Sequence, residues 1–271
     1  MRYTNYMNDT QSQTYLLYAQ KLAEEAAKIM KQYYHTDYKK ELKDDQTPVT
    51  IADTEINDMV IEKIKQDFPE HGVIGEEATW QSDAETVWVC DPIDGTTAYI
   101  VHLPTSVFSI AVVYNGVPLV AVIMNPWTND VYTAIKGDGA FRNQQKIRVS
   151  NRQWPSVCIS TSGIGPKEAG TLQDKVVASF SNEVAVTHFS GLSYQGCLIA
   201  EGAIDGRVFF HNGAHDIAAV KVIVEEAGGR VTDLDGDEQP YNEPINGAVI
   251  SNGNIHNELV ERVREYANSW D

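Results

Sequence analysis

The chain has 271 residues, of which 42% are hydrophobic, and a formal net charge of −17 at pH 7. A chain of this length can bury a large core, either as one compact unit or as two closely packed halves. The charge argues against nucleic acid as a bulk partner, because basic residues would have to attract its phosphates. It allows a small anionic substrate if metal ions supply the positive charge.

The N-terminal part of the chain predicts two helices. Residues 1–12 are polar and are expected to be frayed, whereas apolar residues recur at helical spacing from Leu16 to Tyr33. A second helix is expected to begin at Asp53, whose carboxylate can cap the first turn, and to end before Pro69.

The most informative segment lies where a short apolar run breaks into a turn. Residues 87–90 read as a buried strand, and Pro92 is expected to stop its ladder, so that Asp91 and Asp94 fall at the strand's end. Both carboxylates and the Ile93 carbonyl can then face one cation. A ligand set made of carboxylate and carbonyl oxygens favours magnesium, with manganese as an alternative.

The residues that follow this aspartate pair are suited to an anion. Gly95 lets a ligand approach the backbone, and Thr96 and Thr97 stand where a helix can begin, with free N–H groups for an oxyanion. Taken alone, Asp91 and Asp94 are better explained by an Asp-Pro turn with an Asx cap. The metal assignment therefore depends on the neighbouring motifs.

Strands are expected from Ser106 onward. Residues 107–113 and 117–124 flank Asn115-Gly116, a strong signal for a hairpin. The segment 136–139, Lys-Gly-Asp-Gly, predicts another hairpin turn rather than a phosphate-binding loop, because no helix follows it. The first half is therefore expected to form two helices and an antiparallel sheet.

The second half alternates predicted strands with predicted helices, which is typical of a layered α/β region. The strands are expected at residues 157–160, 184–189 and 204–210, and the helices at 193–201, 216–227 and 255–265. We expect an N-terminal α+β half over residues 1–150 that carries metal-binding motifs, and a C-terminal α/β half over 151–271 that completes the active site.

The cysteines and the hydropathy predict the cellular compartment. Cys90, Cys158 and Cys197 lie in apolar runs without a C-x-x-C spacing and are odd in number, which favours reduced core thiols. The sequence shows no signal peptide and no apolar run long enough to cross a membrane. We expect a cytoplasmic protein with no membrane partner.

Further motifs stand before and after the aspartate pair. They are Val49-Thr50-Ile51-Ala52-Asp53, Gly75-Glu76-Glu77, His215-Asp216 and Gly228-Gly229. In this order, with Asp91 to Thr97 between them, they resemble the motifs of the inositol monophosphatase family. That family belongs to a superfamily of magnesium-dependent, lithium-sensitive phosphatases that includes fructose bisphosphatase.

The resemblance implies a fold, an activity and an oligomeric state. The implied fold is an α+β, layered αβαβα sandwich of the sugar phosphatase type. The implied activity is hydrolysis of inositol monophosphate and other small phosphate esters, with two to three Mg²⁺ ions in each site. The implied assembly is a homodimer.

The resemblance also implies the metal ligands. Glu76, Asp91 and the Ile93 carbonyl would hold one ion, while Asp91, Asp94 and Asp216 would hold a second, with Asp91 bridging the two. A third, weaker ion would lie beside Glu76, where Glu77 and Lys43 would reach it through water.

Catalytic and substrate-binding roles follow from the same resemblance. Thr96, oriented by Asp53, would hold the attacking water as a general-base relay. The amides of Gly95 and Thr96 would bind phosphate oxygens, and Asp216 would face the ester oxygen. Asp94 is a further expected contact of the substrate.

The sequence departs from the family at the substrate end. His215 replaces the family's tryptophan, Ala98 replaces a common asparagine, and the usual acidic reader of sugar hydroxyls is missing from residues 209–213, where His211 becomes the candidate contact. Nucleotide-type substrates therefore stay open, such as the 2′-phosphate of NADP or the 3′-phosphate of adenosine bisphosphate, as does fructose bisphosphate. A non-catalytic relative that acts through protein partners is the alternative from another class.

Overall fold

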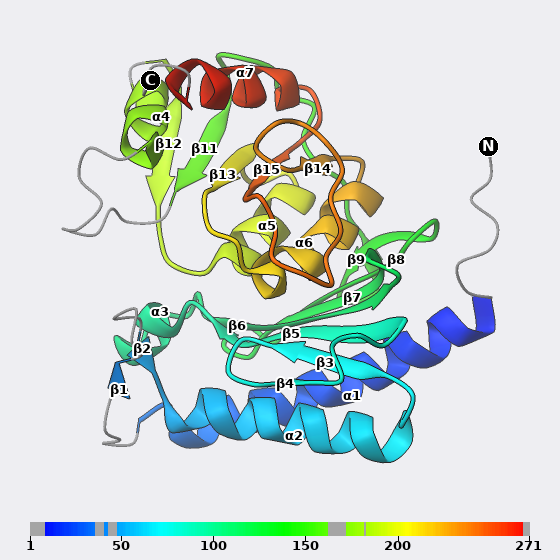
Figure 1. Ribbon diagram of the computed structural model, residues 1–271. Helices are drawn as coiled ribbons and strands as arrows, with labels where there is room; N and C mark the ends of the chain where they lie inside the picture. Colours follow the sequence, from blue (N-terminus) through cyan, green and yellow to red (C-terminus); the bar gives the residue numbers. More distant parts are fainter. Residues whose placement is uncertain (1–8, 36–40, 43–47, 162–171, 182, 268–271) are drawn as a thin grey trace.

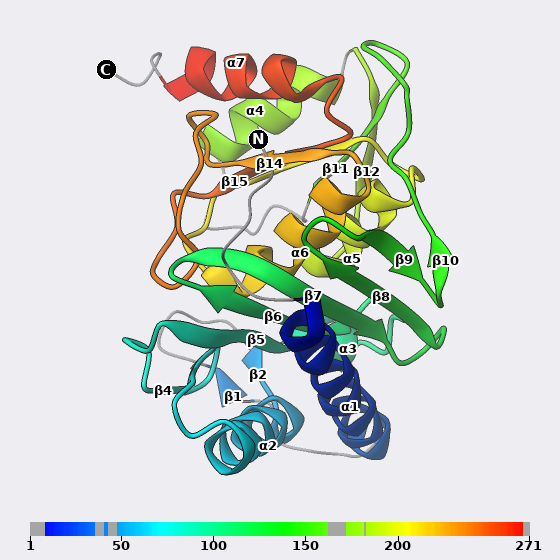
Figure 2. The same ribbon diagram turned by 90° about the vertical axis from the view of Figure 1, so that its right-hand side faces the viewer.

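The structure is a computed structural model and describes residues 9–35, 41–42, 48–161, 172–181 and 183–267. Helices and sheets alternate in five layers (Figures 1 and 2). From one side to the other these are α1 and α2, an eight-stranded sheet, α5 and α6, a five-stranded sheet, and α4 and α7. The predicted αβαβα sandwich is confirmed.

Helix α1 (Asp9–Tyr33) covers the outer face of the larger sheet together with α2 (Ile51–Asp67). The prediction that residues 1–12 are frayed is wrong for residues 9–12, because they belong to α1, Ser12 is buried, and Gln11 donates to the Tyr15 hydroxyl at 2.7 Å. Helical packing thus extends into a stretch whose composition is polar.

Helix α2 has Thr50 as its N-cap, three residues before Asp53, the predicted cap. Thr50 is the residue before its first turn, and its backbone N–H and hydroxyl both donate to Asp53 Oδ2, at 2.9 and 2.5 Å. Asp53 is therefore the third helical residue and the partner in a capping box, not the N-cap itself. The predicted stop before Pro69 is confirmed.

The larger sheet has the strand order β10-β9-β8-β7-β6-β5-β3-β4. Its strands are β3 (Gly72–Gly75), β4 (Thr79–Trp80), β5 (Thr86–Asp94), β6 (Val107–Tyr114), β7 (Val117–Asn125), β8 (Asp130–Ile135), β9 (Gly139–Arg142) and β10 (Gln145–Lys146). The hairpin at Asn115-Gly116 is confirmed, with φ values of 47° and 79°. The sheet is not purely antiparallel, because β3 pairs with β5 in parallel.

Strand β5 corrects a prediction about Pro92. The strand does not stop there but continues to Asp94, with a register shift between the pairs Asp91–Ser109 and Asp94–Val107. Three residues of β5 therefore advance against two of β6, which is a bulge. Pro92 is tolerated because a bulge leaves a ladder position unpaired, where a missing N–H has no cost.

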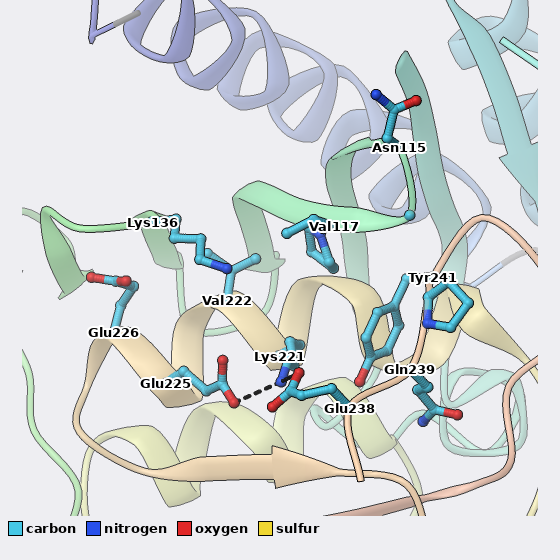
Figure 3. Close-up of a pocket in the computed structure, with 13 residues that line it drawn as sticks. Asn115, Val117, Lys136, Lys221, Val222, Glu225, Glu226, Glu238, Gln239 and Tyr241 are labelled. Atoms are coloured by element: carbon cyan, nitrogen blue, oxygen red, sulfur yellow. Dashed lines mark hydrogen bonds and ion pairs between the residues drawn. The ribbon is translucent and has the colours of Figure 1, made fainter. Parts of the chain in front are cut away.

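The predicted turn at Lys136-Gly137-Asp138-Gly139 is confirmed between β8 and β9. Its backbone does bind an anion, but one supplied by the chain itself. The amides of Gly137 and Gly139 donate to the two carboxylate oxygens of Glu226, at 2.7 and 2.8 Å. Glu226 lies beside Lys136 at this turn (Figure 3).

The smaller sheet has the order β12-β11-β13-β15-β14. Its strands are β11 (Cys158–Thr161), β12 (Ala185–His188), β13 (Gly206–Phe209), β14 (Arg230–Thr232) and β15 (Ala248–Ser251), and the helices of this half are α4 (Leu172–Ser181), α5 (Leu192–Ala200), α6 (Ala214–Glu226) and α7 (His256–Ala267). The three predicted strands and three predicted helices are confirmed. Helix α4 and strands β14 and β15 were not predicted.

Helices α5 and α6 lie between the two sheets and are apolar on nearly all sides, as expected of a helix with no solvent face. Cys197 of α5 and Cys90 of β5 are buried, whereas Cys158 is half-buried, and all three are free thiols as predicted. Within the described residues, no helix is long and apolar enough to span a bilayer. The division of the chain near Ser150 stays a prediction.

Three remaining elements are small. Strands β1 (Glu41–Leu42) and β2 (Pro48–Val49) pair with each other, and α3 (Thr96–Ile100) begins where the two threonines predicted a helix start.

His256 makes the stability of the fold dependent on pH. The side chain is 1% exposed, with Nδ1 2.9 Å from the Ser251 hydroxyl and Nε2 2.9 Å from the Thr232 hydroxyl. Because Thr232 donates its own proton to the Asp233 carbonyl, we infer that Nε2–H donates to Thr232 and that Nδ1 accepts from Ser251. This network needs a neutral ring.

Burial lowers the pKa of His256 from 6.5 to about 4. Below pH 6.5 the unfolded chain binds a proton at His256 that the folded chain does not bind. The contribution of His256 to the free energy of unfolding is therefore complete above pH 6.5 and is lost as the pH falls towards 4. We expect the free energy of unfolding to fall by roughly 2 kcal/mol from this group between pH 7 and pH 5. Denaturant unfolding of wild type and His256→Asn at both pH values measures this fall in the free energy of unfolding. The same pH dependence in the two proteins would contradict the assignment.

Candidate metal centre and active site

A cleft of about 220 Å³ opens where the end of β5 meets α3, α5 and α6. Strand β5 supplies its aspartates, the loop before α5 supplies one wall, and α6 supplies the residue opposite. The lining residues are Glu76, Asp91, Ile93, Asp94, Gly95, Thr96, Thr97, Ser190, Gly191, Leu192, Phe209 and Asp216. Most of the predicted site residues therefore line one cleft.

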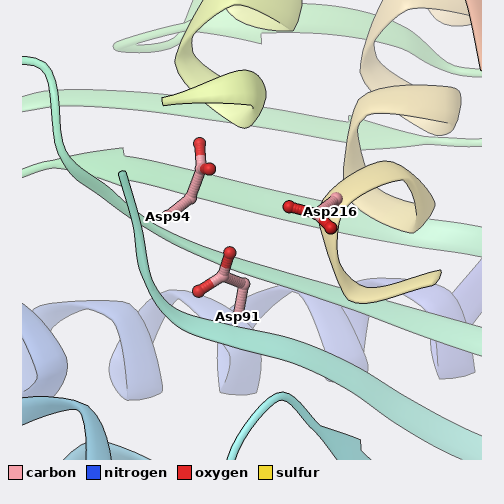
Figure 4. Close-up of side chains that lie close together, drawn as sticks. All are labelled: Asp91, Asp94 and Asp216. Atoms are coloured by element: carbon pink, nitrogen blue, oxygen red, sulfur yellow. The ribbon is translucent and has the colours of Figure 1, made fainter. Parts of the chain in front are cut away.

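Three aspartates form the centre of this cleft. Asp91 and Asp94 come from the bulge of β5 and Asp216 from the first turn of α6, and the three side chains lie close together, with Asp216 reaching from α6 towards the other two (Figure 4). One oxygen from each lies within 4.8 Å of the others. The bulge matters for this arrangement, because in a regular strand residues three apart point to opposite faces of the sheet.

The three carboxylates are poorly compensated without a cation. Burial raises the pKa of Asp91 well above its usual range, and the charges of Glu76 and Asp94 add to this effect. Burial likewise raises the pKa of Asp94 to about 7, with Asp216 as the next cause. A bound dication would reverse both effects, and a cluster of oxygen donors fits a hard ion such as Mg²⁺.

Asp94 also has a structural role that the sequence did not predict. Its Oδ1 accepts from the Leu192 amide at 3.0 Å, and its Oδ2 accepts from the Ser193 amide at 2.5 Å. These are unpaired N–H groups of the first turn of α5, so Asp94 caps a helix that lies nearly one hundred residues away in sequence. No local pattern reports such a contact.

Two glycines let the segments carrying this contact approach each other. Gly95 has a φ of 84°, and a Cβ on it would lie 3.0 Å from the Gly191 Cα. Gly191 has a φ of 96°, and a Cβ on it would lie 2.6 Å from the Thr105 carbonyl oxygen. A side chain at either position would separate Asp94 from α5.

Thr96 and Asp53 are brought together as predicted. The Thr96 hydroxyl lies 3.4 Å from Asp53 Oδ1 and 3.1 Å from the Ile93 carbonyl oxygen, so it has two acceptors for one proton. Asp53 is 0% exposed, and burial raises its pKa to about 7 even though the bonds from Thr50 lower it. A group with this pKa can exchange a proton near neutral pH.

Other predicted residues lie outside the cleft or outside the described residues. Glu77 does not line the cleft, but its charge helps to raise the pKa of Asp53. His211 is exposed, with its ring centroid 5.4 Å from that of Phe209, and it does not line the cleft either. Lys43 falls outside the described residues.

His215 and Ala98 do not disturb the centre. His215 is half-buried, and its Nε2 lies 3.5 Å from Asp216 Oδ2, so the ring packs beside the aspartate. Ala98 is fully buried in α3.

Sequence reasoning missed part of the cleft wall. Ser190 lies in the loop before α5 and Leu192 is the first residue of that helix, and neither belongs to a motif. Phe209 falls in the strand predicted at residues 204–210, but it was not expected to line the cleft. Arg207 was missed as well: it is 4% exposed, and the carboxylates of Asp94 and Asp216 are close enough to raise its pKa against the lowering effect of burial. An arginine inside the apolar run 204–210 was the available signal.

Comparisons with known proteins agree with this geometry. A family model described as "Inositol monophosphatase family" matches residues 11–268. The chain is 32% identical over 257 residues to a histidinol-phosphatase of Mycobacterium tuberculosis, covering 92% of this chain and 97% of the relative. It is 32% identical over 217 residues to a fructose-1,6-bisphosphatase/inositol-1-monophosphatase of Thermotoga maritima, covering 80% and 82%.

A third relative has a name of a different kind, Nus factor SuhB of Xylella fastidiosa, which is 34% identical over 189 residues and covers 67% of each chain. Among solved structures, an IMPase of Thermotoga maritima superposes with a TM-score of 0.85 at 28% identity, covering 94% of this chain and 99% of that one.

Proposed function

As a member of the inositol monophosphatase family, this chain is a phosphoric monoester hydrolase, and we propose that it is a Mg²⁺-dependent one that hydrolyses inositol monophosphate and other small phosphate esters. We further propose that it acts in the cytoplasm as a homodimer. The observation that carries the proposal is the cluster of Asp91, Asp94 and Asp216 beside the Thr96–Asp53 pair.

The proposed ligand sets use the carboxylate and carbonyl oxygens of residues that line the cleft. Glu76, Asp91 and the Ile93 carbonyl would hold one ion, and Asp91, Asp94 and Asp216 a second. Glu77 and Lys43 are assigned to the surroundings of a third ion beside Glu76. When bound, the ions supply positive charge that neutralises phosphoryl oxygens and makes an attacking water more acidic.

The proton route uses the chain's own residues. Thr96 accepts a proton from the attacking water and passes its own to Asp53, which has no direct access to the cleft because it is fully buried. The distance of 3.4 Å is long for a hydrogen bond between oxygens, as is common for a catalytic contact before substrate binds. In this proposal Thr96 touches the reacting water and Asp53 positions Thr96.

The amides at the start of α3 and the aspartate of α6 would hold the substrate. Gly95 and Thr96 direct backbone N–H groups towards the phosphoryl oxygens, and Asp94 and Asp216 contact the substrate on the opposite side, where Asp216 faces the ester oxygen. His211 remains a candidate contact at the outer edge.

The cleft favours a loose specificity for the alcohol. Apart from the four metal-ligand carboxylates, the described wall offers Leu192, Phe209, glycines and hydroxyls, and no acidic group to read sugar hydroxyls. Strong discrimination needs buried polar groups matched to the substrate. The names of the relatives support the same range, since one is a histidinol-phosphatase and another a fructose-1,6-bisphosphatase/inositol-1-monophosphatase.

A role through protein partners is the second candidate, favoured by the relative named Nus factor SuhB. The cleft keeps the four carboxylates proposed for the two main ions and Thr96, so such a role would add to hydrolysis rather than replace it.

One panel assay tests the proposed function. Inositol monophosphate, fructose bisphosphate, adenosine bisphosphate and NADP are compared as kcat/KM at one Mg²⁺ concentration, with a chelator and with lithium as further arms. We expect hydrolysis only with Mg²⁺ or Mn²⁺, inhibition by lithium, and at least one other ester within about tenfold of inositol monophosphate. Unchanged activity in excess chelator would refute the metal assignment. A preference for one ester beyond about a thousandfold would refute the loose pocket.

A further inference from the structure

A second cavity, of about 600 Å³, lies away from the metal cleft. It is enclosed by the β6–β7 turn, Lys136, the second half of α6 and residues 238–241 (Figure 3). Strand β6 pairs with Asp94 at Val107 and reaches this turn after Tyr114, so roughly 23 Å of strand separate the two cavities. They are distinct sites.

The wall of this cavity contains a buried phenol without a partner. Tyr241 is 1% exposed, and its hydroxyl forms no hydrogen bond with any residue that the structure describes. The neighbouring Gln239 side chain accepts from the Asn246 amide and donates one of its two N–H groups to the Gly247 carbonyl, both at 2.8 Å. Its NH₂ group is near enough to lower the pKa of the phenol but forms no hydrogen bond with the hydroxyl. The Tyr241 hydroxyl points towards Lys221 and Glu238 (Figure 3). A buried hydroxyl left in this state is costly unless a ligand satisfies it.

Two carboxylates beside the phenol have oxygen atoms to spare. The buried Lys221 ammonium donates to Glu225 Oε1 and Glu238 Oε2, both at 2.7 Å, and to the Val231 carbonyl at 2.8 Å, so its three protons are used. These bonds and that from the Val231 amide reach Glu225 through Oε1 and Glu238 through Oε2, so each carboxylate has a second oxygen that can accept. A carboxylate oxygen can only accept, so these atoms call for a donor.

The charge around the cavity favours a cation. Glu225 and Glu226 stand in the last turn of α6, which contains no basic residue, and the carbonyl end of a helix carries a partial negative charge. With Glu238, three carboxylates line the cavity against Lys136 and Lys221. The excess charge is negative, and the Lys221 protons are already in use.

We propose that this cavity binds a small organic cation with a primary ammonium group on an aliphatic chain. The ammonium donates to Glu225, Glu238 and the Tyr241 hydroxyl, and the chain lies against Val117 and Pro240. In this proposal the ligand acts as an effector, because the cavity shares no lining residue with the metal cleft. The proposal does not depend on the proposed phosphatase function.

Calorimetric titration of the full chain with 1,4-diaminobutane tests the proposal. Excess Mg²⁺ is present so that the acidic metal cleft does not compete for the diamine. We expect one saturable event with a Kd below about 1 mM, weakened at least about tenfold in Glu238→Gln and in Tyr241→Phe. Glu62→Gln is the matched control, because the Glu62 side chain is 75% exposed and paired with a lysine, much as the Glu238 side chain is 73% exposed. This control should bind like wild type.

The two variants test the proposal independently. Tyr241→Phe removes a hydroxyl that has no partner, so the melting temperature of the unliganded protein should not fall, and weaker binding cannot then be attributed to unfolding. Should that variant not fold, the exposed Glu238 still decides the matter. Failure to saturate by about 10 mM, an unchanged Kd in Glu238→Gln, or tighter binding of succinate, which has the same length and opposite charge, would overturn the proposal.

Discussion

Asp91→Asn is expected to lower kcat/KM for a phosphomonoester by at least about 100-fold while raising the melting temperature of the metal-free protein. Asp91 is the proposed ligand of both main ions, so replacing it removes one negative charge from each ligand set. Its Oδ1 accepts from the Ile93 amide at 3.0 Å, and an asparagine oxygen can keep that bond. Asp91 is also buried beside Glu76, Asp94 and Asp216, and relief from this environment stabilises the metal-free fold.

Asp94→Asn provides the contrast for this prediction. It should lose activity to a similar extent, but an asparagine cannot accept from both the Leu192 and the Ser193 amide, so the start of α5 loses one cap bond. We expect its metal-free melting temperature to lie below that of Asp91→Asn. Steady-state kinetics and thermal unfolding without metal measure both properties. A near-normal rate in Asp91→Asn would refute the metal assignment, and equal melting temperatures would refute the cap.

Thr96→Ala is expected to lower kcat by about 10²–10⁴, the usual range for a general-base contribution, and to change KM little. The alanine removes a hydroxyl that lies within reach of both the Ile93 carbonyl and Asp53. Thr96→Ser keeps that hydroxyl and serves as the control, with activity close to wild type. A rise in KM alone would show that Thr96 binds substrate and does not transfer a proton.

Asp53→Asn should resemble Thr96→Ala, and the double variant should be less than additive, because two members of one relay fail together. An asparagine can turn its oxygen towards Thr50 and keep the cap of α2, but its NH₂ group then faces Thr96 and cannot take a proton. Unfolding experiments on the single variants check that α2 is intact. If the losses of kcat in the two single variants simply add, Asp53 acts as a capping residue only.

The sequence predicted those parts of the site whose signals are local. Pro92 between Asp91 and Asp94, and Gly95 after them, mark a break in the chain at this point, whereas the metal role of the two aspartates came from the resemblance to a family. The hairpin at Asn115-Gly116 follows from the need for positive φ. Pro92 misled the prediction because a proline stops a regular ladder, whereas in a bulge its missing N–H has no cost. Whether a bulge forms depends on β6, which lies later in the chain.

The contacts that were missed are those between segments far apart in sequence. Asp94 caps α5 across nearly one hundred residues, and nothing near Leu192 or near Asp94 indicates a partner at that distance.

Strand β14 was missed for another reason. It has three residues, Arg230–Thr232, too few for an alternating pattern to emerge, and its pairing with β15 defines it.

The helical layer formed by α5 and α6 makes the two sheets mutually dependent. Helix α6 packs against strands of both sheets and exposes almost none of its surface to solvent. A fragment ending near Ser150 would lack α6, so one side of the larger sheet would be uncovered. The aspartate cluster divides in the same way, with Asp91 and Asp94 before that point and Asp216 after it. Neither half of the chain therefore contains the whole aspartate cluster, and a gene duplication or fusion that kept only one half would encode an incomplete site.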